Sequence, residues 1–226
     1  MDASLDTNVI IHLYQASFQS ILFERFQRLF VYEYIRSQEV ANNANLEVIA
    51  AFDEDLKNGN YELITNDYLK RIGMYPVFLQ QVKEHRILFE GGDLGEVYAI
   101  SLARTLGCMC LVTDDIKERG PHYTLMRIPD SDVIPLAFYE IIFLDYLQSR
   151  ISEGELITRF NSICESSGLQ FNLKSKLKFF IKRFWNDPYT DSEKSWMNSF
   201  CNSNSISAYM RMHALLKYIN EKVRKP

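Results

Sequence analysis

Residues 91–115 read GGDLGEVYAISLARTLGCMCLVTDD, and this stretch decides the fold that the sequence predicts. Its first half has the apolar spacing of a helix, in which Asp93 and Glu96 are placed as a capping box. Gly107 ends that helix, because glycine readily adopts the left-handed conformation of a helix C-cap. Residues 108–113 then form an almost continuous apolar run, as in a buried parallel strand. The stretch therefore predicts a helix–strand unit with carboxylates at both of its ends.

The segments on either side of this unit also alternate between strand and helix patterns. Strands are expected at residues 4–11, 30–32, 61–65 and 125–128, and helices at 17–30, 34–41, 46–56 and 132–150. Such alternation is typical of a parallel sheet covered by helices, so we predict an α/β fold.

The character of the chain changes after residue 150. Three helical patterns follow one another, separated by polar turns, at residues 153–166, 172–185 and 206–224. No strand pattern in this part of the sequence is convincing. We therefore predict two regions, an α/β domain over residues 1–150 and a helical, basic region over residues 151–226.

The composition is typical of a globular protein of the cytoplasm. A hydrophobic fraction of 47% and a charged fraction of 24% supply enough apolar residues for a core beneath a charged surface. No apolar run reaches the about 18 residues of a membrane span, and the first residues lack a secretory signal. Four cysteines are too few for a disulfide scaffold in 226 residues, so we expect a reduced, cytoplasmic protein with no membrane segment.

The charges are distributed unevenly along the chain. From Arg150 to Pro226 there are 13 Lys and Arg against 7 Asp and Glu, a balance of +6, whereas the first 149 residues have a balance of −10. The helical pattern at 172–185 interleaves aromatic residues with Lys174, Lys176, Lys178, Lys182 and Arg183. These basic residues are candidates for binding a nucleic-acid backbone. An equally good interpretation is that the aromatic residues form a core and the basic residues are solvated.

Acidic residues recur at four positions along the predicted α/β domain, and these positions are called acidic stations below: Asp6, Glu39, Asp93 with Glu96, and Asp114 with Asp115. Asp6 interrupts the first predicted strand at its carboxyl end and Asp114 follows the strand pattern at 108–113, and ligands bind at the carboxyl ends of strands in open α/β sheets. Asp6 is also suited to a helix N-cap, and Glu39 to the solvated flank of a helix. Carboxylates repel one another, so a fold that gathers them usually neutralises them with a divalent cation.

The order and context of these stations resemble the PIN-domain nucleases, a family that includes bacterial toxin-type ribonucleases. The motifs that carry the resemblance are LDTNVIIHL at 5–13, IRSQEV at 35–40, GDLGEVYAISLA at 92–103 and LVTDD at 111–115. The third motif is close to the D-x-G-E branch of the family. The similarity covers about residues 4–130, and it implies a three-layer α/β/α domain with a parallel sheet. The helical C-terminal region has no counterpart in the family pattern.

The resemblance also implies roles for particular residues. It makes Asp6, Glu39, Glu96 and Asp115 the catalytic acids. It adds Asp93 and Asp114 to these four as ligands of Mg²⁺ or Mn²⁺, the cofactor that an all-oxygen site favours. Asn8 and Thr113 are implied as supporting polar residues.

The implied function is a metal-dependent endoribonuclease that hydrolyses phosphodiester bonds, such as the toxin of a toxin–antitoxin or defence system. RNA is the expected partner and single-stranded DNA the alternative. An antitoxin or other regulatory protein and a second copy of the chain are further candidate partners. The alternative function is a PIN-like nucleic-acid- or protein-binding module without catalysis. A phosphatase of the haloacid-dehalogenase type is disfavoured, because Asn8 stands where such an enzyme has a second Asp, two residues after Asp6.

Overall fold

The computed structural model describes residues 1–88, 94–116, 122, 125, 131–188 and 190–223. The chain forms two compact units, Met1–Phe138 and Tyr139–Pro226. None of the helices in the described ranges combines the length and the apolar character that a membrane span requires.

A sheet of five parallel strands, in the order β3-β2-β1-β4-β5, forms the centre of the first unit. The strands are β1 (Asp2–Leu5), β2 (Arg28–Tyr32), β3 (Glu62–Ile64), β4 (Cys110–Val112) and β5 (Ile134–Leu136). Ala3 of the central strand pairs with Leu29 on one side and with Cys110 on the other. All three residues are buried, which explains why these strands are short continuous apolar runs. The predicted α/β fold with a parallel sheet is therefore confirmed.

The chain adds strands to the sheet first in one direction and then in the other, although all five strands are parallel. From β1 the chain adds β2 and then β3 on one side, and it later adds β4 and β5 on the other side. The reversal lies between β1 and β4, so the connections that leave these two strands depart in opposite directions. In open α/β sheets, such a topological switch point opens a crevice at the carboxyl ends of the strands, where ligands bind.

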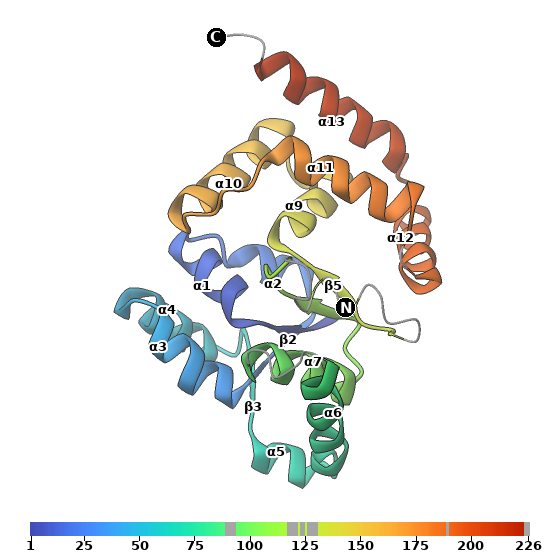
Figure 1. Ribbon diagram of the computed structural model, residues 1–226. Helices are drawn as coiled ribbons and strands as arrows, with labels where there is room; N and C mark the ends of the chain where they lie inside the picture. The colour runs from blue at the N-terminus through green and yellow to red at the C-terminus, as the bar shows by residue number, and fades with distance from the viewer. Residues whose placement is uncertain (89–93, 117–121, 123–124, 126–130, 189, 224–226) are drawn as a thin grey trace. The chain divides into compact units, whose positions relative to one another are not determined.

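Helices fill the connections between the strands of this unit. They are α1 (Thr7–Gln15), α2 (Ser20–Arg25), the π-helix η1 (Ile35–Val40), α3 (Ala41–Asn43), α4 (Leu46–Lys57), α5 (Asn66–Arg71), α6 (Tyr75–Leu88) and α7 (Leu94–Leu106). Figure 1 shows α1 and α2 on one side of the sheet and α7 with α6 on the other side. The helix α7 packs directly on β1, β2 and β4.

Three predicted elements have different boundaries in the structure. The helix expected at residues 17–30 is the short α2, which ends at Arg25, and its last residues belong to β2, which begins at Arg28. The strand expected at residues 4–11 ends at Leu5, and α1 begins two residues later. The helix expected at residues 132–150 is wrong in its first part, where residues 134–136 form β5. Pro135 explains the difference, because proline disrupts a helix interior but is tolerated on an edge strand such as β5. The predicted strand at 125–128 falls mainly outside the described residues.

The described part of the second unit is helical. Its elements are α9 (Phe138–Leu147), which begins at the end of the first unit, α10 (Glu153–Ser166), α11 (Leu173–Ile181), the π-helix η2 (Lys182–Asn186), α12 (Asp191–Ser203) and α13 (Ala208–Val223). The predicted helices at 153–166, 172–185 and 206–224 correspond to α10, α11 with η2, and α13. The sequence reading missed α12, which begins where Thr190 caps the backbone N–H of Glu193.

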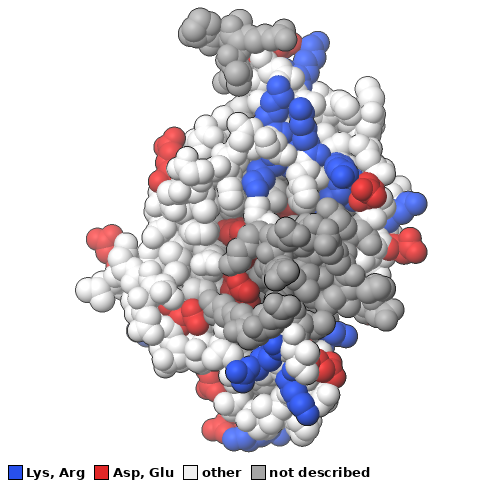
Figure 2. Space-filling model, viewed as in Figure 1, with Lys and Arg blue, Asp and Glu red and all other residues white. Residues whose placement is uncertain are grey.

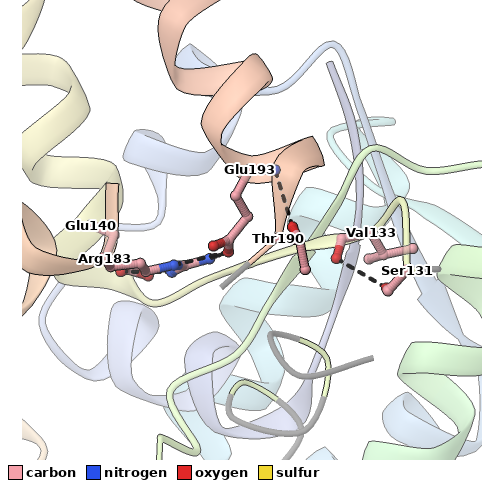
Figure 3. Close-up of polar contacts among 6 residues, drawn as sticks. All are labelled: Ser131, Val133, Glu140, Arg183, Thr190 and Glu193. Carbon is pink, nitrogen blue, oxygen red and sulfur yellow. Dashed lines mark hydrogen bonds and ion pairs between the residues drawn. The ribbon is translucent and has the colours of Figure 1, made fainter. Parts of the chain in front are cut away.

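A buried ion-pair triad joins three helices of this unit (Figure 3). The guanidinium of Arg183 on η2 lies 2.8 Å from a carboxylate oxygen of Glu140 on α9. Its Nε donates to Glu193 on α12 over 2.9 Å, and its Nη2 donates to the same oxygen. Arg183 and Glu140 are 0% exposed and Glu193 is 3% exposed. Three charges are thus removed from water together, and each depends on the others for its compensation.

A second buried polar contact links α6 and α7 in the first unit. The hydroxyl of Ser101 donates its single proton to the Val97 carbonyl. The Ser101 oxygen must therefore accept in its other contact, in which Nδ1 of His85 donates over 2.9 Å. The opposite nitrogen, Nε2, is buried without a hydrogen-bond partner in the described part of the chain. Burial, helped by the positive charge of Arg104, lowers the pKa of His85 to about 4. The imidazole is therefore neutral near pH 7.

Removing the guanidinium of Arg183 is expected to destabilise the second unit. Arg183→Ala leaves two buried carboxylates without a cation, which should lower the free energy of unfolding by about 3–5 kcal/mol. Denaturant unfolding followed by tryptophan fluorescence measures this, because both tryptophans, Trp185 and Trp196, lie in this unit. Lys182→Ala, at the adjacent exposed residue, is the control and should change stability by less than about 0.5 kcal/mol. Equal effects of the two substitutions would contradict the structural role of the triad.

The lowered pKa of His85 predicts a loss of stability in acid. Its pKa is depressed from about 6.5 in the unfolded chain, so its contribution is present above pH ~6.5 and is lost as the pH falls toward 4. The loss attributable to this residue between pH 7 and pH 4 should be about 3 kcal/mol. Urea unfolding followed by circular dichroism at several pH values measures it. His85→Leu should remove this part of the pH dependence, whereas His213→Leu, at an exposed histidine, should leave it unchanged.

Candidate functional site

The carboxyl ends of β1 and β4 are joined by hydrogen bonds at the switch point. Asp6, the first residue after β1, donates its backbone N–H to the Val112 carbonyl over 3.0 Å. The Thr113 hydroxyl, just after β4, donates to Oδ2 of Asp6 over 2.9 Å. The other carboxylate oxygen of Asp6 accepts the Thr7 N–H over 2.7 Å at the start of α1. Asp6 is thus both a strand-end acid and a helix N-cap, the two interpretations that the sequence left open.

Asp6 is only 2% exposed. A carboxylate buried to this degree is costly unless hydrogen bonds or nearby positive charge stabilise its negative charge. The hydroxyl of Thr113 and the backbone N–H of Thr7 supply two hydrogen bonds. The N-terminus of α1, with its unpaired N–H groups, also favours a negative charge at this point. The Thr7 hydroxyl is buried and has no hydrogen-bond partner among the described residues.

Glu96 reaches the same edge of the sheet from α7. This helix ends at Gly107, whose φ of +67° fits the predicted C-cap, and the N–H of Cys108 bonds back to the Ala103 carbonyl over 2.8 Å. The strand β4 begins three residues after Gly107, so α7 runs antiparallel to it. A helix of 13 residues is about 20 Å long, which places its first turn at the carboxyl edge. Glu96 belongs to that turn and is 8% exposed.

Asp114 and Asp115 occupy different environments despite being neighbours. One carboxylate oxygen of Asp114 accepts the Phe138 N–H over 2.9 Å, and the other lies 2.8 Å from Nδ1 of His12. Both oxygens thus have protein partners, and the side chain is 0% exposed. Asp115 is more exposed, and its backbone N–H donates to the Thr113 hydroxyl over 3.2 Å. This arrangement favours a structural role for Asp114 and leaves Asp115 as the better candidate ligand.

Glu39 and Asn8 lie on the helices that surround this edge. Glu39 is partly exposed on η1, which packs against α1 and α7, and it accepts a long 3.4 Å hydrogen bond from Asn43. A π-helical turn is uncommon and is frequent at functional sites. Asn8 is exposed in the first turn of α1. Asp93, the remaining predicted ligand, lies outside the described residues.

Two residues near the same edge were not recognised in the sequence. The helix α1 brings His12 to Asp114, which lies 102 residues further along the chain. Glu33 immediately follows β2, and its side chain accepts the Asn66 N–H over 3.0 Å. An acid directly after an apolar strand is a signal that identifies Glu33. No local pattern identifies His12, because its partner is fixed only when α1 packs.

The donor chemistry of this edge fits a hard divalent cation. The candidate ligands are carboxylates, with the Thr7 hydroxyl as a neutral oxygen, and Mg²⁺ and Mn²⁺ prefer oxygen ligands. Within the described ranges, no three His, Cys, Asp or Glu side chains are grouped closely enough to hold one metal ion. That spacing is compatible with Mg²⁺, which usually retains several waters and uses one or two carboxylates.

The basic residues of α11 and η2 divide into three environments. Lys174, Lys178 and Lys182 are exposed, whereas the ammonium of Lys176 lies 4.0 Å from the centre of the Phe171 ring. Arg183 belongs to the buried triad and is 0% exposed. The expectation that Arg183 contacts nucleic acid is therefore corrected, because both sides of its guanidinium are occupied by buried carboxylates.

Comparison with known proteins identifies no relative. The sequence matches no protein-family model, and searches of curated proteins and of solved structures likewise give no match.

The different environments of the two neighbouring acids predict different effects on stability. Asp114→Ala removes acceptors from the Phe138 N–H and from His12, and should lower the free energy of unfolding by about 2–3 kcal/mol. Asp115→Ala should cost clearly less, because Asp115 is more exposed. Urea unfolding of both variants in EDTA measures the difference without a contribution from metal binding. A larger loss for Asp115→Ala than for Asp114→Ala would show that the assignment is reversed.

Proposed function

We propose that the first unit is a PIN-like, divalent-metal-dependent endoribonuclease whose reaction takes place at the carboxyl edge of β1 and β4. The observation that carries the proposal is the placement of Asp6 at the topological switch point, hydrogen-bonded to Thr113 of the neighbouring strand end. We assign two further acids to this edge, Glu96 in the first turn of α7 and Asp115 just beyond the end of β4. Carboxylates that gather at one edge repel one another, and a divalent cation bound among them offsets this repulsion.

The proposed ligands of Mg²⁺ or Mn²⁺ come from Asp6, Glu96, Asp115 and Glu39, of which one or two would contact the ion directly and the others through water. When bound, such a cation activates a coordinated water for attack on a phosphodiester and offsets charge that develops on the phosphate oxygens. Thr113 orients Asp6, since its hydroxyl donates to Oδ2. No nucleophilic side chain is needed for this type of hydrolysis.

The same carboxylates determine when nucleic acid can approach this edge. Without a cation, Asp6, Glu96 and Asp115 repel a phosphate group by like charge. With a cation bound, the local charge falls and a phosphodiester becomes an additional oxygen ligand. Substrate binding at the carboxylates is therefore expected to require metal. RNA is the proposed substrate, with single-stranded DNA as the alternative.

Neutralising the central acids is expected to abolish cleavage. With Mn²⁺ or Mg²⁺ present, the parent protein should cut total RNA, whereas Asp6→Asn and Glu96→Gln should be slower by about 100-fold or more. Mapping of new RNA ends with and without EDTA measures the activity. Glu54→Gln, at an exposed residue of α4, is the matched control and should cut as fast as the parent.

A second readout separates metal binding from catalysis. Mn²⁺ should raise the melting temperature of the parent protein and of Glu54→Gln, because a ligand that binds only the folded state stabilises it. The shift should be smaller in Asp6→Asn. Equal cleavage by the parent and by both site variants would refute the proposal. A protein that neither cleaves RNA nor gains stability with either metal would favour a non-catalytic binding module.

A further inference from the structure

The exposed lysines of α11 and η2 form a single row. Lys174, Lys178 and Lys182 are each four residues apart, which places successive members on one side of the helix with an axial rise of about 6 Å. This row is called the lysine stripe below. Lys174 and Lys178 form no ion pair within the described part of the chain, and Lys182 pairs only loosely, at 3.5 Å, with exposed Asp187. The stripe therefore presents nearly uncompensated positive charge to solvent.

Other basic residues of the same helices do not share this arrangement. Lys176 is partly buried and lies over the Phe171 and Tyr139 rings, at 4.0 and 5.2 Å from their centres. Arg183 is enclosed by Glu140 and Glu193. Two of the five basic side chains are thus engaged in contacts within the unit, and the other three form an exposed row. Figure 2 shows Lys and Arg side chains gathered on the C-terminal helices of this unit.

The opposite side of α11 is not available to a membrane. Leu177, Phe180 and Ile181 are 0%, 0% and 7% exposed, because they pack into the core of the unit. An amphipathic helix that lies on a membrane must insert such an apolar face into the lipid. The stripe can therefore recognise a polyanion in solution without inserting into lipid.

The residues beside the stripe favour a single strand over a duplex. Phe179 and Trp185 are aromatic and partly exposed, and they lie within or at the end of the stretch that carries the three lysines. Proteins that bind single strands combine a basic track along the backbone with aromatic rings on which unpaired bases stack. Bases inside a duplex are already stacked and cannot use such rings. The rise of about 6 Å between lysines is also comparable to the spacing of successive phosphates along one extended strand.

We propose that the lysine stripe binds the phosphate backbone of single-stranded RNA, as a surface of the second unit separate from the carboxylates of the first. The choice of RNA as the polyanion rests on the proposed nuclease function. The binding itself requires no metal, because the contacts are between ammonium and phosphate groups. Binding and cleavage are consequently separable, and each can be tested while the other fails.

Fluorescence anisotropy with a short labelled single-stranded RNA, in EDTA, tests the stripe on the full chain. The triple variant Lys174→Gln, Lys178→Gln and Lys182→Gln should bind about tenfold more weakly than the parent at low salt. Over roughly 50 to 200 mM KCl, its slope of log affinity against log salt should be smaller in magnitude by about 2, since each single-strand phosphate contact contributes about 0.7. A duplex RNA of the same sequence should bind the parent more weakly than the single strand.

A charge-matched triple variant is the control. Arg159→Gln, Lys194→Gln and Lys217→Gln remove three positive charges from α10, α12 and α13 without changing the stripe. This variant should keep a salt slope close to that of the parent. Equal losses in the two triple variants would mean that only net charge matters, and an unchanged slope in the stripe variant would overturn the proposal. Tighter binding of the duplex would overturn the single-strand assignment, whether or not the protein cleaves RNA.

Discussion

The hydrogen bonds between the end of β1 and the end of β4 are the constraint on which the candidate site depends. The Asp6 N–H bonds to the Val112 carbonyl, and the Thr113 hydroxyl bonds to the Asp6 side chain. These contacts fix two strand ends that are more than a hundred residues apart in the chain. The order in which strands are added to the sheet reverses between β1 and β4, and ligands bind at such switch points in open α/β sheets.

The fold holds several acids near this point by giving each a different kind of compensation. Asp6 is stabilised by the N-terminus of α1 and by a hydroxyl donor. Asp114 accepts a hydrogen bond from a backbone N–H and lies within hydrogen-bond distance of Nδ1 of His12. Asp115 and Glu96 remain as candidate ligands beside Asp6. Two adjacent aspartates in one motif therefore have distinct physical roles.

The second unit separates basic residues in a similar way. Arg183 cannot be solvated in its position, so two carboxylates from other helices neutralise it and join those helices. The exposed lysines on the same helical stretch have almost no acidic partners and leave a positive surface. The buried Arg183 thus has a structural role, whereas the exposed lysines of the stripe can contact a ligand in solution.

The sequence by itself determined the parallel α/β fold, the C-cap at Gly107, the apolar run that became β4 and the acid after β1. These features depend on periodicity and on local backbone preferences, which a sequence displays directly. Only the tertiary structure decided that His12 pairs with Asp114, that Glu33 lies at the carboxyl edge, and that Arg183 is buried. It also decided that residues 134–136 form an edge strand. Proline has no N–H to donate, and Pro135 is tolerated because β5 has a neighbouring strand, β4, on one side only. The physical reason is that burial and pairing between distant segments are properties of packing, and packing is absent from the local pattern of residues.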